Sequence, residues 1–177
     1  MRLFIAINFT SEVKDAISET IANLRSVAHS GSYTAWDNLH LTLAFIGETD
    51  RVNDIVEVMT ETAQQTFHEP LQIRLSGAGT FKRRGGDTHW IAVHKTPVLE
   101  ALADRLADNL REAGFPIEKR RFIPHITIGR NVVLPSGAAI MVHPVFMSAN
   151  SISLMQSRQE DNRTSYTELA SVQCRRY

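Results

Sequence analysis

Residues 39–43 read Leu-His-Leu-Thr-Leu, and residues 124–128 read Pro-His-Ile-Thr-Ile. Both segments carry the pattern His-x-Thr within an apolar, β-favouring run, and their histidines, His40 and His125, lie 85 residues apart in a chain of 177. Successive side chains of a strand point to opposite faces, so each segment presents one imidazole and one hydroxyl on the same face. The spacing of nearly half the chain predicts a duplicated unit that brings the two pairs face to face across a cleft.

The residues around these strands predict three helices and several further strands. Apolar periodicity indicates helices over 13–24, 52–63 and 97–110, and strands over 3–7, 39–46, 71–75, 90–93, 122–128, 145–147, 152–155 and 166–172. We expect the helices to be capped by Thr10 or Ser11, by Thr49 or Asp50, and by Thr96, in that order. Loops are expected over 29–35, 131–144 and 157–164, and a hairpin turn over 82–88.

This order of elements predicts an α+β fold, with three helices over antiparallel or mixed sheet. A chain of this length suits one domain, 1–177. The repeated motif suggests that this domain consists of two pseudo-symmetric lobes, with one His-x-Thr motif from each half.

The composition is that of an ordinary globular protein. It contains 19 Lys+Arg and 19 Asp+Glu, giving a formal net charge of zero, and 43% of its residues are hydrophobic. The single cysteine, Cys174, excludes disulfide frameworks and cysteine-based zinc sites. The apolar run 3–7 is too short for a signal peptide or a membrane span. We therefore expect a cytoplasmic monomer with no membrane partner.

Two opposed histidines suit acid–base catalysis at a phosphate. Histidine titrates near neutral pH, so one imidazole can accept a proton while the other donates one. The hydroxyls of Thr42 and Thr127 can bind phosphate oxygens, and Arg130 follows His125 by five residues and can neutralise charge. This set requires neither a metal nor a cofactor, and no Asp, Glu or Cys is spaced near His40 or His125 to complete a metal site.

Other interpretations apply to some of these residues. A single His-x-Thr is weak evidence, and the chain contains a third copy, His94-Lys95-Thr96, in which Thr96 is better explained as a helix cap. Core packing is the more common role of aromatic residues, but four of them offer a face on which a nucleobase could stack: Trp36, Phe45, Phe81 and Phe122.

The paired motifs resemble those of the 2H phosphoesterases, a family named for its two histidine motifs. Within that family, the sequence is most similar to the RNA 2′,3′-cyclic phosphodiesterases, also called 2′-5′ RNA ligases. The resemblance extends over nearly the whole chain. It is carried by residues 2–7, 36–48 and 121–130, by the Gly-x-Gly-x-Phe segment 77–81, and by residues 153–158 with Tyr166.

The resemblance implies a two-lobe fold with helices outside sheets that surround a central cleft. It implies that His125 is the general base that activates water, and that His40 is the general acid that protonates the leaving 3′ oxygen. The product is then a 2′-phosphate, and the implied substrates are RNA ends or nucleotides with a 2′,3′-cyclic phosphate. Two alternatives stay open, namely 2′-5′ RNA ligation by the same residues and an RNA-end-binding module with little turnover.

Three compact basic clusters lie at 82–84, 119–121 and 175–176. Surface loops are often charged, so each cluster by itself is equally consistent with a solvated turn. The cluster 82–84 lies on the predicted hairpin turn, and the cluster 119–121 directly precedes the His125 strand. Their possible RNA contacts are Lys82, Arg83, Arg84 and Arg121.

Overall fold

The computed structural model describes residues 1–174, so the basic cluster at 175–176 lies outside the described residues. Its α+β architecture confirms the predicted fold class. The elements are β1 (Arg2–Asn8), α1 (Ser11–Val27), β2 (Ser30–Tyr33), the 3₁₀ turn η1 (Trp36–Asn38), β3 (His40–Glu48), α2 (Val52–Thr66), β4 (Leu71–Phe81), β5 (Asp87–Val93), α3 (Pro97–Glu112), β6 (His125–Val133), β7 (Phe146–Ala149), β8 (Ser151–Glu160) and β9 (Arg163–Gln173).

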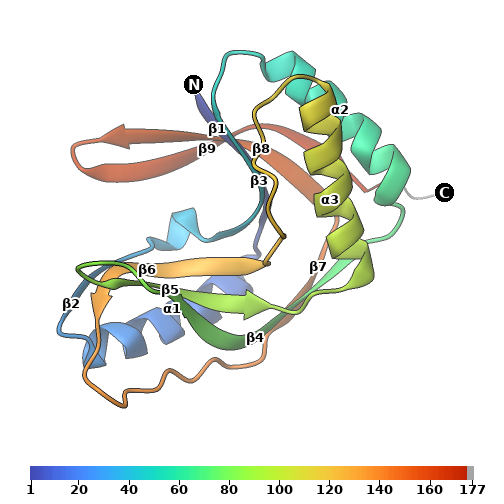
Figure 1. Cartoon of the computed structure of the whole chain (residues 1–177). Coiled ribbons are helices and arrows are strands. Elements are labelled where there is room, and N and C mark those ends of the chain that lie inside the picture. The colour runs from blue at the N-terminus through green and yellow to red at the C-terminus, as the bar shows by residue number, and fades with distance from the viewer. Residues whose placement is uncertain (175–177) are drawn as a thin grey trace.

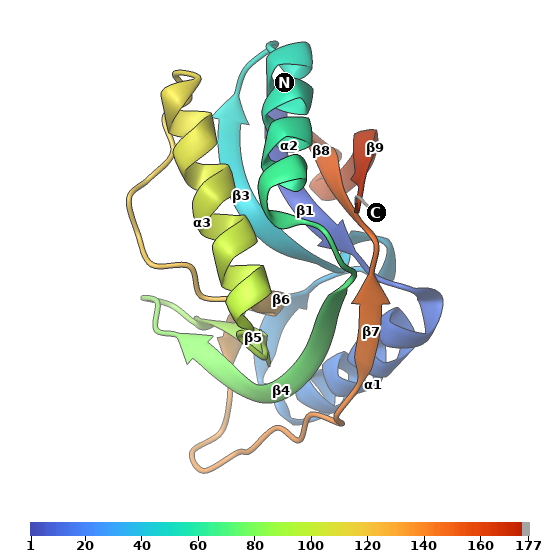
Figure 2. The same ribbon diagram turned by 90° about the vertical axis from the view of Figure 1, so that its right-hand side faces the viewer.

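The strands form two sheets, a four-stranded one in the order β3-β1-β8-β9 and a five-stranded one in the order β2-β6-β5-β4-β7. Every strand pair among the described residues is antiparallel. Helices α2 and α3 pack against each other and contact the four-stranded sheet, whereas α1 contacts β2 and β6 of the five-stranded sheet (Figures 1 and 2). Each sheet therefore has its own helices packed against it, and the two sheets contact each other through β3 and β6.

The apolar positions predicted for the helices form the core. In α3, Leu99, Leu102, Leu106 and Leu110 are all fully buried, as their spacing predicts. The hydroxyl of Thr96 accepts the hydrogen bond of the Leu99 N–H at 3.2 Å and caps this helix. Thr10 caps α1 in the same way, which decides between the two residues proposed for that helix start.

The start of α2 differs from the prediction. Its N-terminal flanking residue is Arg51, which makes no side-chain capping bond, and the Thr49 hydroxyl instead accepts the backbone N–H of Arg51 at 3.2 Å. The Arg51 guanidinium pairs with Asp54 at 2.7 Å in the first turn. The Thr49 hydroxyl thus closes a turn just before the helix, and no side-chain hydrogen bond caps the start of α2.

Three segments predicted as loops contain strand. Residues 30–33 form β2, an edge strand paired with β6, although the sequence there is polar. β6 begins at His125 rather than at 122 and continues to Val133, which shortens the loop predicted from residue 131. The region 157–164 belongs to the long β8–β9 hairpin, whose turn lies at Asp161 and Asn162, both with positive φ. Figure 1 shows this hairpin projecting beyond β1 and β3 of its own sheet.

No helix among the described residues is long and apolar enough to span a membrane.

Candidate active site

The two His-x-Thr motifs come from different sheets. His40 is the first residue of β3, at the edge of the four-stranded sheet, and His125 is the first residue of β6, inside the five-stranded sheet. β3 and β6 contact each other, and the charge of His125 acts on the ionisation of His40. The fold thus brings the two motifs together from opposite sides.

Both imidazoles are held by the same local hydrogen bond. Nδ1 of His40 lies 2.6 Å from the carbonyl oxygen of Asn38, and Nδ1 of His125 lies 2.7 Å from the carbonyl oxygen of Ile123. A carbonyl oxygen only accepts hydrogen bonds, so in each neutral ring the proton is on Nδ1 and the lone pair is on Nε2. The backbone two residues earlier therefore fixes the tautomer of both histidines.

Each imidazole also lies within a cluster of three rings. In the His40 ring cluster (Phe4, His40, Tyr166), the ring centroids are 4.9 to 5.1 Å apart. In the His125 ring cluster (Phe81, Trp90, His125), they are 5.3 to 5.8 Å apart. Such edge and tilted contacts restrict ring orientation.

Phe4 and Trp90 were not predicted as neighbours of the histidines, and Tyr166 had no predicted role in the site. A signal for Trp90 exists in retrospect, because Gly79 is its partner on β4 and leaves room for the indole ring. A Cβ atom built on Gly79 would lie 2.3 Å from that ring.

The His40 environment favours the neutral imidazole. Burial is the largest cause that lowers the pKa of His40 below its usual value of 6.5, while the hydrogen bond to Asn38 opposes it. The positive charges of Arg130, His125 and Lys14 lower this pKa further. An anion bound near His40 would favour its protonated form.

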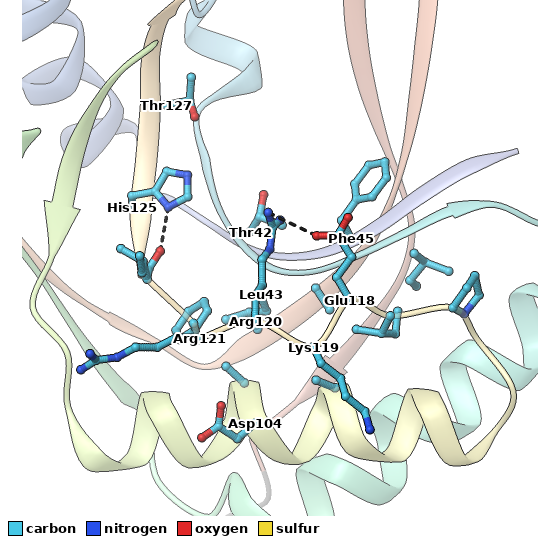
Figure 3. A pocket seen from close by; sticks show the side chains of 18 of the residues that line it. Thr42, Leu43, Phe45, Asp104, Glu118, Lys119, Arg120, Arg121, His125 and Thr127 are labelled. Carbon is cyan, nitrogen blue, oxygen red and sulfur yellow. Dashed lines mark hydrogen bonds and ion pairs between the residues drawn. The ribbon is translucent and has the colours of Figure 1, made fainter. Parts of the chain in front are cut away.

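The threonines lie as the strand alternation predicts. Oγ1 of Thr42 is 2.9 Å from Nε2 of His40, so this hydroxyl and imidazole share one face of β3. Thr42, His125, Thr127 and Arg130 line one groove of about 1060 Å³. Figure 3 shows Thr42 on one side of this space and His125 with Thr127 on the other.

The predicted basic contacts separate in the structure. Arg83 and Arg121 line the groove, but Lys82 pairs with Asp87 at 2.9 Å, and Arg84 is an exposed residue of the hairpin turn. The groove continues past the segment 118–121 to α3 (Figure 3). His94 of the third His-x-Thr is exposed after the end of β5, and Thr96 is the cap of α3, as predicted.

The four candidate stacking residues have different surroundings. Phe81 belongs to the His125 ring cluster, and Phe122 packs partly buried against the core. Phe45 is 46% exposed beneath Arg2, and Trp36 is 40% exposed. Core packing therefore does not explain Trp36 or Phe45.

No three His, Cys, Asp or Glu side chains within residues 1–174 are arranged to hold a metal ion.

Comparison with known proteins gives consistent matches. The family model of the 2′-5′ RNA ligase superfamily matches residues 13–168. An RNA 2′,3′-cyclic phosphodiesterase of Thermotoga maritima is 36% identical over 132 residues, which cover 73% of this chain and 70% of the relative. The protein of the same name from Escherichia coli is 30% identical over 95% of this chain and 93% of its own.

The fold is also similar to solved structures. A protein of Thermus thermophilus superposes with a TM-score of 0.77 at 26% identity, covering 99% of this chain and 98% of its own. E. coli LigT complexed with 3′-AMP superposes with a TM-score of 0.76 at 28% identity, covering 97% of each chain.

Proposed function

Because the chain belongs to the 2′-5′ RNA ligase superfamily, we propose that it hydrolyses the 2′,3′-cyclic phosphodiester of RNA ends or nucleotides to a 2′-phosphomonoester. Relatives that match this chain over most of their own length are named RNA 2′,3′-cyclic phosphodiesterase. The reaction needs one group that accepts a proton, one that donates a proton, and positive charge near the phosphate.

His125 is the proposed general base. Its Nδ1–H is engaged by the Ile123 carbonyl, which leaves the lone pair on Nε2 to accept a proton from water. The water oxygen then forms a bond to phosphorus. The ring contacts of Phe81 and Trp90 keep the imidazole in the orientation that this transfer requires.

His40 is the proposed general acid. As the bond from phosphorus to the 3′ oxygen breaks, protonated His40 gives its Nε2 proton to that oxygen. Burial favours the neutral form, so the acid must be charged in the complex, and the negative phosphodiester beside it favours protonation. We therefore expect His40 to be protonated in the complex with the substrate.

Thr42, Thr127 and Arg130 are the proposed phosphate-binding residues. The two hydroxyls can donate to the non-bridging oxygens, and the guanidinium can offset the charge that these oxygens gain in the transition state. All three side chains line the groove that also contains His125.

The matched hydrogen bonds of the two histidines carry this proposal, because they leave two Nε2 atoms, one from each sheet, for proton transfer. The test is incubation of the purified protein with a 2′,3′-cyclic nucleotide in EDTA, with product identification by chromatography. We expect a 2′-phosphate. A 3′-phosphate would contradict the roles given to the histidines, and no turnover with retained binding would favour the RNA-end-binding module.

A second activity is 2′-5′ ligation, in which the 5′-hydroxyl of another RNA strand replaces water as the nucleophile. The groove favours this candidate, because it extends from His125 to α3 and includes Arg83 and Arg121. His125 lines this groove, so a nucleophile that is bound in it can reach the proposed base.

A further inference from the structure

The turn η1 presents an exposed tryptophan directly before the His40 strand. Trp36 is 40% exposed, and its Nε1–H donates to Oδ1 of Asp15 at 2.8 Å. The Lys14 ammonium lies over the ring, 4.6 Å from its centroid. A large indole that is fixed at its N–H edge and still exposed is a preformed surface for a planar group.

The same turn is fixed relative to His40. The Asn38 side chain donates to the Thr164 carbonyl of β9 at 2.6 Å, and the Asn38 carbonyl accepts the Nδ1–H of His40. Figure 1 shows η1 (light blue) between the β8–β9 hairpin and β6, on the side away from α2 and α3. Trp36 is four residues from His40, so their Cα atoms are at most about 14 Å apart.

The stereochemistry of the proposed reaction decides on which side the nucleoside lies. In an in-line displacement, the attacking and leaving oxygens occupy opposite sides of phosphorus. Water enters from the His125 side, so the leaving 3′ oxygen faces His40. That oxygen stays attached to the ribose, so the ribose, its base and the upstream strand extend from the His40 side.

We propose that Trp36 stacks a nucleobase of the RNA strand that carries the cyclic phosphate, with Lys14 beside it to attract the strand's phosphates. This inference rests on the proposed function and on the roles given to the two histidines. The charge of Lys14 already acts on His40, which supports its proximity to the reacting end. The subsite recognises any base, because every base has a face that can stack on an aromatic ring.

The test compares three substrates that differ in what can reach Trp36. They are a ribose 2′,3′-cyclic phosphate without a base, a 2′,3′-cyclic mononucleotide, and a trinucleotide that ends in a 2′,3′-cyclic phosphate. Trp36→Ala should raise KM by about 5- to 150-fold for substrates whose base reaches the ring, as expected for loss of one base–aromatic stack. Trp36→Phe should have a smaller effect, and the base-free substrate should be unaffected by either change.

Phe146→Ala is the matched control, because Phe146 is 77% exposed on β7 of the other sheet. It should leave all three substrates unchanged. Equal KM changes for the three substrates, or none, in Trp36→Ala would overturn the stacking site. A lower kcat on every substrate would instead mean that Trp36 only supports η1 and His40.

Binding separates this inference from the proposed function. The affinity of a fluorescent trinucleotide with a 2′,3′-cyclic end should fall in Trp36→Ala by the same factor as KM rises. If the wild type binds this RNA through Trp36 but hydrolyses none of the three substrates, the hydrolase proposal fails and the stacking site stands. If binding is unchanged in Trp36→Ala, the stacking site fails whatever the turnover.

Discussion

Nε2 of His40 lies 2.9 Å from Oγ1 of Thr42, two residues along the same strand. Neutral His40 accepts at Nε2, so the Thr42 hydroxyl donates this bond. A bound phosphate offers the hydroxyl a charged acceptor, so the Thr42 hydroxyl can then donate to a phosphate oxygen of the substrate instead of to His40. The Thr42 hydroxyl thus couples the proposed acid to the proposed phosphate site.

Thr42→Val should therefore lower kcat/KM for a 2′,3′-cyclic nucleotide by about 10- to 100-fold, the loss of one hydrogen bond to a charged group. Thr42→Ser keeps the hydroxyl and should retain most of the activity. Thr127→Val should behave like Thr42→Val, because Thr127 lines the same groove from β6. Steady-state kinetics of the folded variants measures this, and a loss of thermal stability with unchanged kinetics would show that both threonines are structural.

Removal of either histidine should affect the chemical step more than binding. His40→Ala and His125→Ala should each lower kcat by roughly 10²–10⁴-fold, the usual contribution of a positioned proton transfer. His94→Ala is the internal control, because His94 also begins a His-x-Thr but is an exposed residue beyond β5. Near-normal kcat in either of the first two variants would disprove the two-histidine mechanism.

The charge of Arg130 should lower the alkaline limit of activity, in addition to the larger effect of burial on the pKa of His40. Arg130 lowers the pKa of His40, so Arg130→Gln should raise that pKa toward its usual value of 6.5. The acid role requires protonated His40, and kcat/KM reports ionisations of the free enzyme. The alkaline limb of the kcat/KM profile should move to higher pH, while its maximum falls because phosphate binding is weaker.

An NMR titration of His40 in the free protein gives an independent measurement of the Arg130 effect. The imidazole should titrate at higher pH in Arg130→Gln than in the wild type. An unchanged titration would place Arg130 too far from His40 to act on the proposed acid.

The sequence allowed the two histidine strands and α3 to be predicted because apolar and polar residues alternate there with a clear period. β2 was missed because Ser30, Gly31 and Ser32 carry no apolar pattern. An edge strand of this kind forms through backbone hydrogen bonds to β6, which depend on the partner rather than on its own side chains. The prediction placed the tip of the β8–β9 hairpin in a loop for a related reason. Its residues are exposed on both faces, so no alternation of apolar and polar residues marks them as strand.

The surroundings of the histidines could not be predicted in the same way. Tyr166 contacts His40 from 126 positions along the chain, and Trp90 contacts His125 because the β5–β6 register pairs Trp90 with Thr127. Such contacts depend on sheet order and register, which the local pattern does not contain. The burial that lowers the pKa of His40 depends on the same long-range packing.

Gly79 is predicted to be necessary for the shape of the His125 ring cluster. A Cβ atom there would lie 2.3 Å from the Trp90 ring, so Gly79→Ala must displace that ring from its place beside Phe81 and His125. We expect a loss of about 1–3 kcal/mol in the free energy of unfolding, the usual cost of overpacking, together with a lower kcat.

Gly77→Ala is the control on the same strand, because a Cβ atom at Gly77 would meet nothing within 4 Å. It should leave both urea denaturation and turnover close to wild type. Equal effects of the two substitutions would mean that β4 needs glycine for its backbone rather than for the Trp90 ring.

The last prediction separates ligation from hydrolysis. In-line geometry places the strand with the cyclic phosphate on the His40 side and the nucleophile on the His125 side. Hydrolysis uses only water there, whereas ligation must hold a second RNA strand in the groove that contains Arg83. Arg83→Gln should therefore weaken use of the 5′-hydroxyl strand and reduce the salt dependence of ligation by a slope of about one, as for loss of one phosphate contact.

Hydrolysis of a cyclic mononucleotide should be unchanged in Arg83→Gln. Arg84→Gln is the matched control, because Arg84 is the next residue of the same turn and is exposed there, while Arg83 lines the groove. Ligation of two labelled oligoribonucleotides, followed by gel electrophoresis at several salt concentrations, measures the effect. Equal losses of ligation and hydrolysis would place Arg83 at the reacting phosphate itself. Equal effects of the two arginine substitutions on ligation would mean that the charge of the turn acts at a distance, without a strand bound in the groove.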